Sequence, residues 1–161
     1  MPASRPASLV AAVALLFAAS ARANAQTPIV GPAVTALSFG LVVAGNLPGS
    51  VRVTASGLRS TSGATHAAGN RFGVSAASFT VASSPDNTES SVWSVMLPVS
   101  ATLSSGKNEM TIDGFEYSWG PAGGLGGKSS RLLTVGATLH VGARQPSAQY
   151  AGSFALTVVH N

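Results

Sequence analysis

The last twelve residues of the chain, 150–161, place the strongest constraint on its fold. Phe154, Leu156 and Val158 alternate along this stretch with Ala155 and Thr157. Successive side chains of a β-strand point to opposite faces, so this period of two predicts a strand with one face in a hydrophobic core. A strand at the end of a chain must find neighbours or leave a backbone edge unpaired. An unpaired edge can accept a strand from another polypeptide.

The N-terminus predicts export. It carries a basic residue at Arg5, an apolar run from Leu9 to Ala19, and the small-residue pattern Ala23-Asn24-Ala25. These features indicate a signal peptide over residues 1–25, which leaves a mature chain that starts at Gln26. The run of eleven apolar residues is too short for a bilayer, which needs about 20. We therefore expect no integral membrane segment in the mature chain, and a location in the periplasm, at the cell surface or outside the cell.

The composition of the mature chain argues against disulfides, thiolate metal sites and nucleic-acid binding. There is no cysteine, so the chain has neither a disulfide nor a thiolate metal site. Arg5 and Arg22 leave with the signal peptide, so seven Lys and Arg remain against five Asp and Glu, a net charge of +2. These charges are scattered singly, whereas nucleic-acid binding needs a basic patch that displaces counterions from phosphates. We expect one domain and no nucleic-acid partner.

Short apolar alternations separated by Gly, Ser, Pro and Asn predict an all-β fold. The expected strands are 33–43, 50–56, 78–82, 91–97, 109–119, 132–143 and 153–160. About seven such strands predict an immunoglobulin-like, two-sheet β-sandwich. In the sixth expected strand, 132–143, the odd-numbered side chains should face the core: Leu133, Val135, Ala137, Leu139 and Val141.

One strand changes phase, and three connections are expected as loops. Met110 and Ile112 are even-numbered and Phe115 is odd-numbered, so a regular strand would point them to opposite faces. A β-bulge at Asp113-Gly114 would bring all three side chains to one face. The polar or glycine-rich segments 59–70, 83–90 and 120–130 are expected as loops.

Two short motifs are typical of enzymes but do not carry their full patterns here. Gly126-Gly-Lys-Ser129 resembles the end of a phosphate-binding loop, but Ala122 stands where the first glycine of that motif belongs. Ser104-Ser-Gly-Lys107 has a serine-x-x-lysine spacing without the companion motifs, and a hairpin turn explains it better. We expect no catalytic residues, no cofactor and no enzymatic activity.

The remaining polar and aromatic candidates also favour structural roles. His66, His140 and His160 lie far apart in the sequence, so they predict no metal site. The carboxylates Glu109, Asp113 and Glu116 share one strand, where a solvated face is expected. The aromatic residues Trp93, Tyr117 and Trp119 have two interpretations, a sugar-stacking surface or packing against the core, and core packing is the default for aromatics in strands.

A set of ordered motifs resembles a known family. They are Leu37-Ser-Phe-Gly40, Gly49-Ser-Val-Arg-Val53, Ala77-Ser-Phe-Thr-Val81, Met110-Thr-Ile-Asp-Gly-Phe115, Val135-Gly-Ala-Thr-Leu139 and the segment from Tyr150 to Val158. Together they closely resemble the secreted bacterial family known as domain of unknown function 4402. The resemblance covers residues 37–161.

This family is similar in turn to spore coat U-like proteins and to chaperone–usher pilins. The similarity implies an incomplete immunoglobulin-like sandwich whose C-terminal strand is handed to a periplasmic chaperone. The corresponding residues here are Gly152, Phe154, Leu156 and Val158, while His160 stands where pilins have a Tyr or Phe. The implied partners are other copies of the chain in a homopolymer, together with a periplasmic chaperone and an usher.

The mechanism that this similarity implies is strand donation. It divides the mature chain into an N-terminal extension, 26–36, and a sandwich domain, 37–161, with the extension of one subunit completing the sheet of the next. Ile29 and Ala33 would enter a groove, while Val30 and Val34 face the other way. The segment also contains two prolines, which are tolerated only at a sheet edge.

A second hypothesis belongs to another functional class. The chain would be a self-sufficient, monomeric exported binding module, and the loops at 59–70 or 120–130 would contact a ligand.

Overall fold

Short alternating segments form strands throughout the described part of the chain. The computed structural model describes residues 11–13, 29–68, 73–82, 93–122 and 130–160. The strands are β1 (Ala11–Val13), β2 (Ile29–Thr35), β3 (Ser38–Val43), β4 (Gly49–Val53), β5 (Arg59–Gly63), β6 (His66–Ala67), β7 (Val74–Ser75), β8 (Ala77–Ala82), β9 (Trp93–Met96), β10 (Ser100–Ser105), β11 (Asn108–Ala122), β12 (Ser130–Val141), β13 (Gln149–Tyr150) and β14 (Thr157–His160). No helix occurs among these residues, and none of them forms a helix that could cross a membrane.

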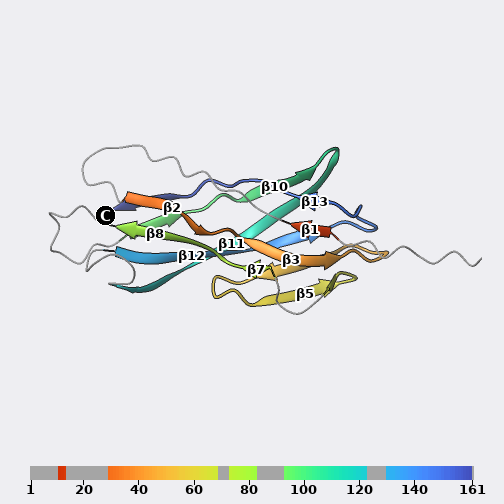
Figure 1. Ribbon diagram of the computed structural model, residues 1–161, viewed down its shortest axis with the longest axis horizontal. Helices are drawn as coiled ribbons and strands as arrows, with labels where there is room; N and C mark the ends of the chain where they lie inside the picture. The colour runs from red at the N-terminus through yellow and green to blue at the C-terminus, as the bar shows by residue number, and fades with distance from the viewer. Residues whose placement is uncertain (1–10, 14–28, 69–72, 83–92, 123–129, 161) are drawn as a thin grey trace, which may run out of the picture.

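The larger sheet is organised around β12. This seven-stranded sheet has the order β10-β11-β12-β4-β5, with β8 and β2 also attached through β12 (Figure 1). One edge of β12 pairs with β11. Its other edge pairs first with β8, over residues 130–135, and then with β4, over residues 137–141. Along this edge, the long strand β12 therefore pairs with β8 near its start and with β4 near its end.

A second layer contains the five-stranded sheet, in which β13, β1, β3 and β6 follow one another and β7 also pairs with β3. Near the C-terminus, β14 pairs with β9 in a separate two-stranded sheet. A bridge between Ser104 and Ala151 connects the C-terminal segment to β10 of the larger sheet. The two layers thus form a sandwich that is joined along one side.

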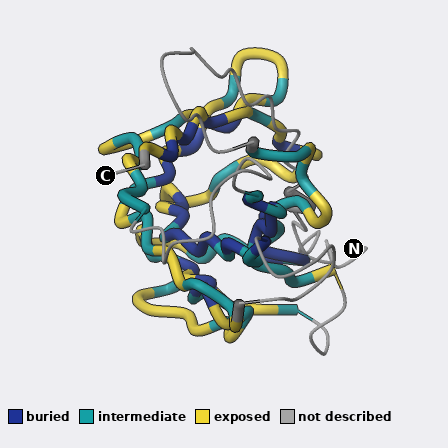
Figure 2. Tube along the Cα trace, turned by 90° about the vertical axis from the view of Figure 1, so that its left-hand side faces the viewer, coloured by how far each residue is buried: buried dark blue, intermediate teal, exposed yellow. Residues whose placement is uncertain are grey.

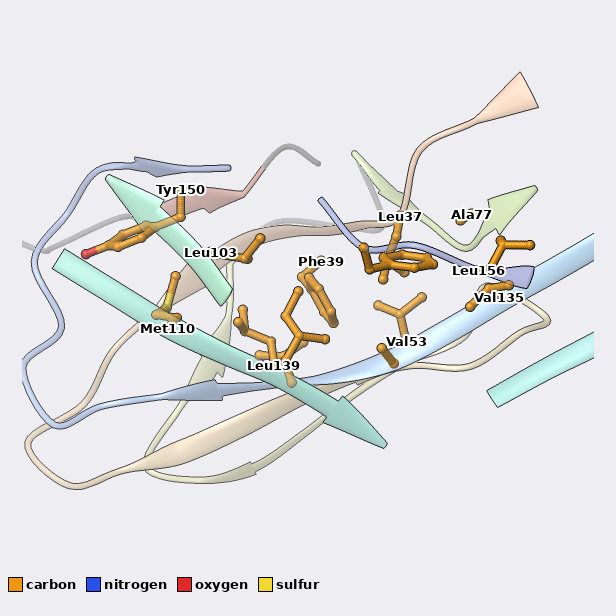
Figure 3. Close-up of a cluster of buried hydrophobic side chains, with 14 of the residues drawn as sticks. Leu37, Phe39, Val53, Ala77, Leu103, Met110, Val135, Leu139, Tyr150 and Leu156 are labelled. Atoms are coloured by element: carbon orange, nitrogen blue, oxygen red, sulfur yellow. The ribbon is translucent and has the colours of Figure 1, made fainter. Parts of the chain in front are cut away.

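The core lies between these layers. Figure 2, viewed along the molecule, shows the buried parts of the chain lining the inside of a ring of strands. Phe39 of β3, Leu103 of β10 and Leu139 of β12 have no exposed surface and meet in the middle of the sandwich (Figure 3). The predicted core face of the sixth strand is confirmed, since all five of its residues, Leu133, Val135, Ala137, Leu139 and Val141, are buried.

The predicted bulge is confirmed. Asp113 pairs with Thr138 and Glu116 pairs with Gly136, so β11 holds one extra residue against β12 between these two pairs. Gly114 lies in that interval with a φ of 56°, a left-handed conformation that glycine adopts without the usual steric penalty. As a result, both Ile112 before the bulge and Phe115 after it contact the core.

Several expectations are corrected by the structure. The predicted loop over 59–70 contains strands β5 and β6. The predicted strand 33–43 is two strands, because the chain passes from the larger sheet to the second layer at residues 36–37. Strand β10 was missed, and the serine-x-x-lysine segment forms its hairpin turn with β11. The all-β sandwich class stands, with more strands than predicted.

Candidate assembly site

The C-terminal segment has the alternation that the sequence predicts. Phe154, Leu156 and Val158 are between 5% and 7% exposed, while the residues between them are exposed. Only its two ends form regular strands: β13 at residues 149–150 and β14 at residues 157–160. The backbone of His160 pairs with that of Trp93 in β9. The C-terminal segment is therefore half-buried along its length, with neighbours on the β9–β10 side.

Two residues fix where this segment begins. The hydroxyl of Tyr150 donates a hydrogen bond to the carbonyl of Pro146, at 2.9 Å, and accepts one from Nε2 of Gln145, at 3.0 Å. Gly152 lies so close to β10 that a Cβ there would be 2.2 Å from the carbonyl oxygen of Thr102. A glycine at this position lets the backbone of the C-terminal segment approach β10.

The predicted donor segment pairs within its own chain. Strand β2 lies antiparallel to β8, from Ile29 opposite Ala82 to Thr35 opposite Ser78. The segment 29–35 is thus the outer strand of the larger sheet in this chain. If the mature chain starts at Gln26, three residues precede this strand.

The pairing of β2 is irregular. Register shifts occur between Val30 and Ala33 and again between Ala33 and Thr35. Val30 and Ala33 both pack against the core, whereas Val34 is 60% exposed. A strict alternation had placed Val30 on the face opposite Ala33. The shift around Pro32 puts both on one face, because an extra residue in a strand reverses the parity of the residues after it.

Polar contacts hold the end of β2 where the chain changes layers. The hydroxyl of Ser78 donates to Oγ1 of Thr35 at 2.9 Å, and the hydroxyl of Ser75 donates to the carbonyl of Ala36 at 2.7 Å. Only Ala36 and Leu37 separate β2 from β3. This connection is short, and Leu37 is fully buried. Strand β2 of the larger sheet is therefore connected to β3 of the second layer through a short, constrained hinge.

The outer face of the larger sheet carries an Arg–Glu ion pair and a hydrogen-bonded His–Asp pair. Nε2 of His140 lies 2.7 Å from Oδ1 of Asp113, with roughly half of each side chain exposed. Arg52 pairs with Glu116, whose other carboxylate oxygen accepts the backbone amide of Ala55 at 2.9 Å. These pairs join β4, β11 and β12 across their exposed face. The predicted solvated face is therefore correct for Asp113 and Glu116.

Glu116 makes stability depend on pH. Partial burial raises its pKa, but the Ala55 amide and the Arg52 guanidinium together hold the net pKa below its ordinary value of 4.5. Because the folded pKa is the lower one, the stabilisation is present above the unfolded pKa and is lost as pH falls through the folded pKa. Surface pairs contribute about 0–1 kcal/mol. We expect Glu116→Gln to lose less than about 1 kcal/mol at pH 7.

Urea unfolding at several pH values measures this effect. The difference between the wild-type chain and the Glu116→Gln variant should shrink as pH falls below 4.5. Glu109→Gln is the matched control, because Glu109 lies on the same strand and is exposed. A difference that persists unchanged into acid would show that the charge of Glu116 is not what stabilises the fold.

The other predicted residues have structural surroundings. No cluster of three or more His, Cys, Asp or Glu side chains is found in the described ranges. His66 is exposed in β6 rather than in a loop. The rings of Trp93 and Trp119 are 5.2 Å apart and pack against the core, which supports the packing interpretation for these two. The phosphate-loop-like residues 126–129 and the predicted loop 83–90 lie outside the described residues.

Among the described aromatic residues, Tyr117 is the one that is exposed. It is 44% exposed and meets Trp119 edge-on at 6.5 Å. The guanidinium carbon of Arg131 lies over the Trp119 ring, 5.8 Å from its centroid. Strand β11 therefore presents one exposed aromatic ring, Tyr117, rather than an exposed Tyr117–Trp119 pair.

These features define an all-β, sandwich-like domain with an N-terminal edge strand and a half-buried C-terminal segment. The family model described as domain of unknown function (DUF4402) matches residues 31–160. The chain belongs to this family. No curated protein and no solved structure shows a significant match to the chain.

Proposed function

We propose that the protein is an exported structural subunit of pilin-like type, which assembles at the cell surface by strand donation. The observation that carries the proposal is the pairing of β2 with β8, because the same register between two copies would link one subunit to the next. Such an exchange repeats contacts that a single chain already makes, so it needs no new interface. A periplasmic chaperone and an usher are the partners that this role implies.

The way β2 is held favours exchange. Its ladder with β8 is interrupted twice, and Pro32 removes one amide donor, so the pairing within one chain is weaker than that of a regular strand. The hinge of two residues between β2 and β3 is short, and short constrained hinges favour domain swapping. An edge strand with a weak ladder and a tight hinge is suited to leave its own sheet for that of a neighbour.

The test is the mass of the mature chain in solution, with and without residues 26–36. We expect residues 26–161 to form oligomers and residues 37–161 to stay monomeric, because the deletion removes the donated strand. A synthetic peptide of residues 26–36 should raise the melting temperature of the deleted chain by binding to the vacant edge of β8. A mature chain that is a stable monomer at every concentration would reject assembly.

Matched peptides identify the contact that matters. Val30 packs against the core, whereas Val34 is 60% exposed on the same strand. A Val30→Asp peptide should fail to stabilise the deleted chain, because it would bury a charge. A Val34→Asp peptide should act like the wild-type peptide. Equal binding by both would place the segment somewhere other than on β8.

A second candidate is a monomeric exported binding module. The observation that favours it is the exposed ring of Tyr117, next to Trp119 at the end of β11 that leads into residues 123–129. Exposed aromatic residues on a rigid sandwich are suited to bind ligands. The same mass measurement separates the two functions, since a binding module stays monomeric.

A further inference from the structure

The most N-terminal described strand, β1, occupies an inner position. Ala12 lies opposite Leu41 of β3 in an antiparallel ladder, and opposite Gln149 of β13 in a parallel one. Both backbone edges of β1 are therefore paired. Figure 1 shows the short β1 between β13 and β3 at one end of the molecule.

Strand β1 closes the ring of strands at that end. The C-terminal segment is joined to β10 by the bridge between Ser104 and Ala151, and β3 is joined to β6 and β7 on its far edge. Among the described residues, β1 is the strand that joins β3 to β13. Without it, the near edges of both strands would lose their backbone partners.

The slot that β1 occupies lies over the core. Phe39 and Val42 of β3 and Tyr150 of β13 are at most 1% exposed, and Leu103 of the adjoining β10 is fully buried. Removal of β1 would let water reach the edge of this cluster and would leave the backbone groups of β3 that face β1 without ladder partners. Unpaired strand edges of this kind are templates for another strand.

The sequence places β1 inside the segment predicted to be cleaved. Residues 11–13 lie in the apolar run Leu9–Ala19, ahead of the expected cleavage after Ala25. Among the described residues, the next strand along the chain, β2, does not replace β1 because it is already paired with β8. Cleavage would thus remove an inner strand from the sandwich.

We propose that the predicted signal peptide, residues 1–25, called the leader below, occupies this slot through β1. The leader completes the sandwich of the uncleaved chain, and its removal opens a strand-acceptor site between β3 and β13. The proposal rests on the export that the proposed function includes, and it adds a regulatory step. The uncleaved chain is closed, and the mature chain is competent to accept an extended strand that runs parallel to β13 and antiparallel to β3.

An engineered disulfide tests the placement in the full chain. The chain has no cysteine, so Ala12→Cys with Leu41→Cys gives a single pair. Residues directly opposite in an antiparallel ladder are about 4.5–5.5 Å apart, which a disulfide can span. We expect the pair to oxidise intramolecularly in the folded, uncleaved chain. Leu58→Cys with Ala12→Cys is the control that should stay reduced, because Leu58 is exposed and lies outside this ladder.

Cleavage of the folded chain tests the function of the slot. A site for a specific protease in place of residues 23–25 allows the leader to be cut in vitro. We expect cleavage to lower the melting temperature by on the order of 5 °C, and a peptide of residues 9–19 to restore it in a saturable way. An Ala12→Pro peptide should not, because proline removes a ladder amide from an inner strand. In the disulfide-locked chain, cleavage should leave the melting temperature unchanged.

The outcomes separate this inference from the proposed function. If the Ala12→Cys, Leu41→Cys pair forms no disulfide in the uncleaved chain, the leader does not occupy the slot. The same conclusion follows if cleavage of the chain without the disulfide leaves the melting temperature unchanged. Rescue by the Ala12→Pro peptide as good as by the wild-type peptide would also overturn the leader as occupant. If the peptide binds but the mature chain never forms oligomers, the leader-filled slot stands and assembly by exchange of β2 falls.

Discussion

Phe39→Ala is expected to destabilise the full chain by about 3–5 kcal/mol, the usual cost of removing a large buried aromatic side chain. Phe39 has no exposed surface and lies where the second layer meets Leu103 and Leu139 of the larger sheet. The substitution removes contacts with both layers and leaves a cavity that rigid strands cannot fill. Equilibrium unfolding in urea, followed by tryptophan fluorescence, measures the loss.

Val99→Ala is the control for this prediction. Val99 is 91% exposed in the connection between β9 and β10, so its truncation should change stability by less than about 0.5 kcal/mol. If both variants lost the same small amount, the two layers would not share the core described here. If both lost a large amount, Val99 would be buried against something else in solution.

The parts of the fold that the sequence predicts are those with a local period. The alternation of Leu133, Val135 and Leu139 predicted the buried face of β12, and the change of phase after Ile112 predicted the bulge at Gly114. Both patterns arise from the geometry of a single strand. They need no knowledge of which strands are neighbours.

The strands that the sequence missed lack this local signal. Strand β5 reads Arg59-Ser-Thr-Ser-Gly63, is mostly exposed, and is a strand because β4 pairs with it. Strand β10 has one fully buried hydrophobic residue, Leu103. Their structure is set by neighbours far along the chain, and a polar edge strand has the composition of a loop.

In the candidate assembly site, too, the features with a local pattern were predicted and those set by distant contacts were not. Alternation at Phe154, Leu156 and Val158 was enough to predict a half-buried C-terminal segment. The pairing of β2 with β8 and the position of β1 between β3 and β13 depend on contacts between distant segments. One signal was present, since Pro28 and Pro32 limit the segment 26–36 to a sheet edge, where β2 lies. The identity of the strand it pairs with was not readable from the sequence.

Gly152→Ala is expected to destabilise the chain by about 1–3 kcal/mol through overpacking. The added Cβ would lie 2.2 Å from the carbonyl oxygen of Thr102 and 3.0 Å from a methyl group of Leu103. Leu103 can shift its methyl group, but the carbonyl belongs to the backbone of β10, which is paired with β11. The C-terminal segment would have to move away from β10, and this movement weakens the bridge between Ser104 and Ala151.

Gly31→Ala separates this steric effect from the general effect of replacing glycine. A Cβ at Gly31 would meet its nearest atom, the carbonyl oxygen of Thr80, at 3.4 Å, which is ordinary contact. Neither glycine has a positive φ, so alanine at an unstrained site should be neutral or add about 0.4–1 kcal/mol by restricting the unfolded chain. Urea unfolding should therefore show a loss of stability for Gly152→Ala and no loss for Gly31→Ala. Equal stability of the Gly152→Ala chain and the wild-type chain would mean that the C-terminal segment does not lie against β10 at Thr102, and the joined side of the sandwich would then have to be placed elsewhere.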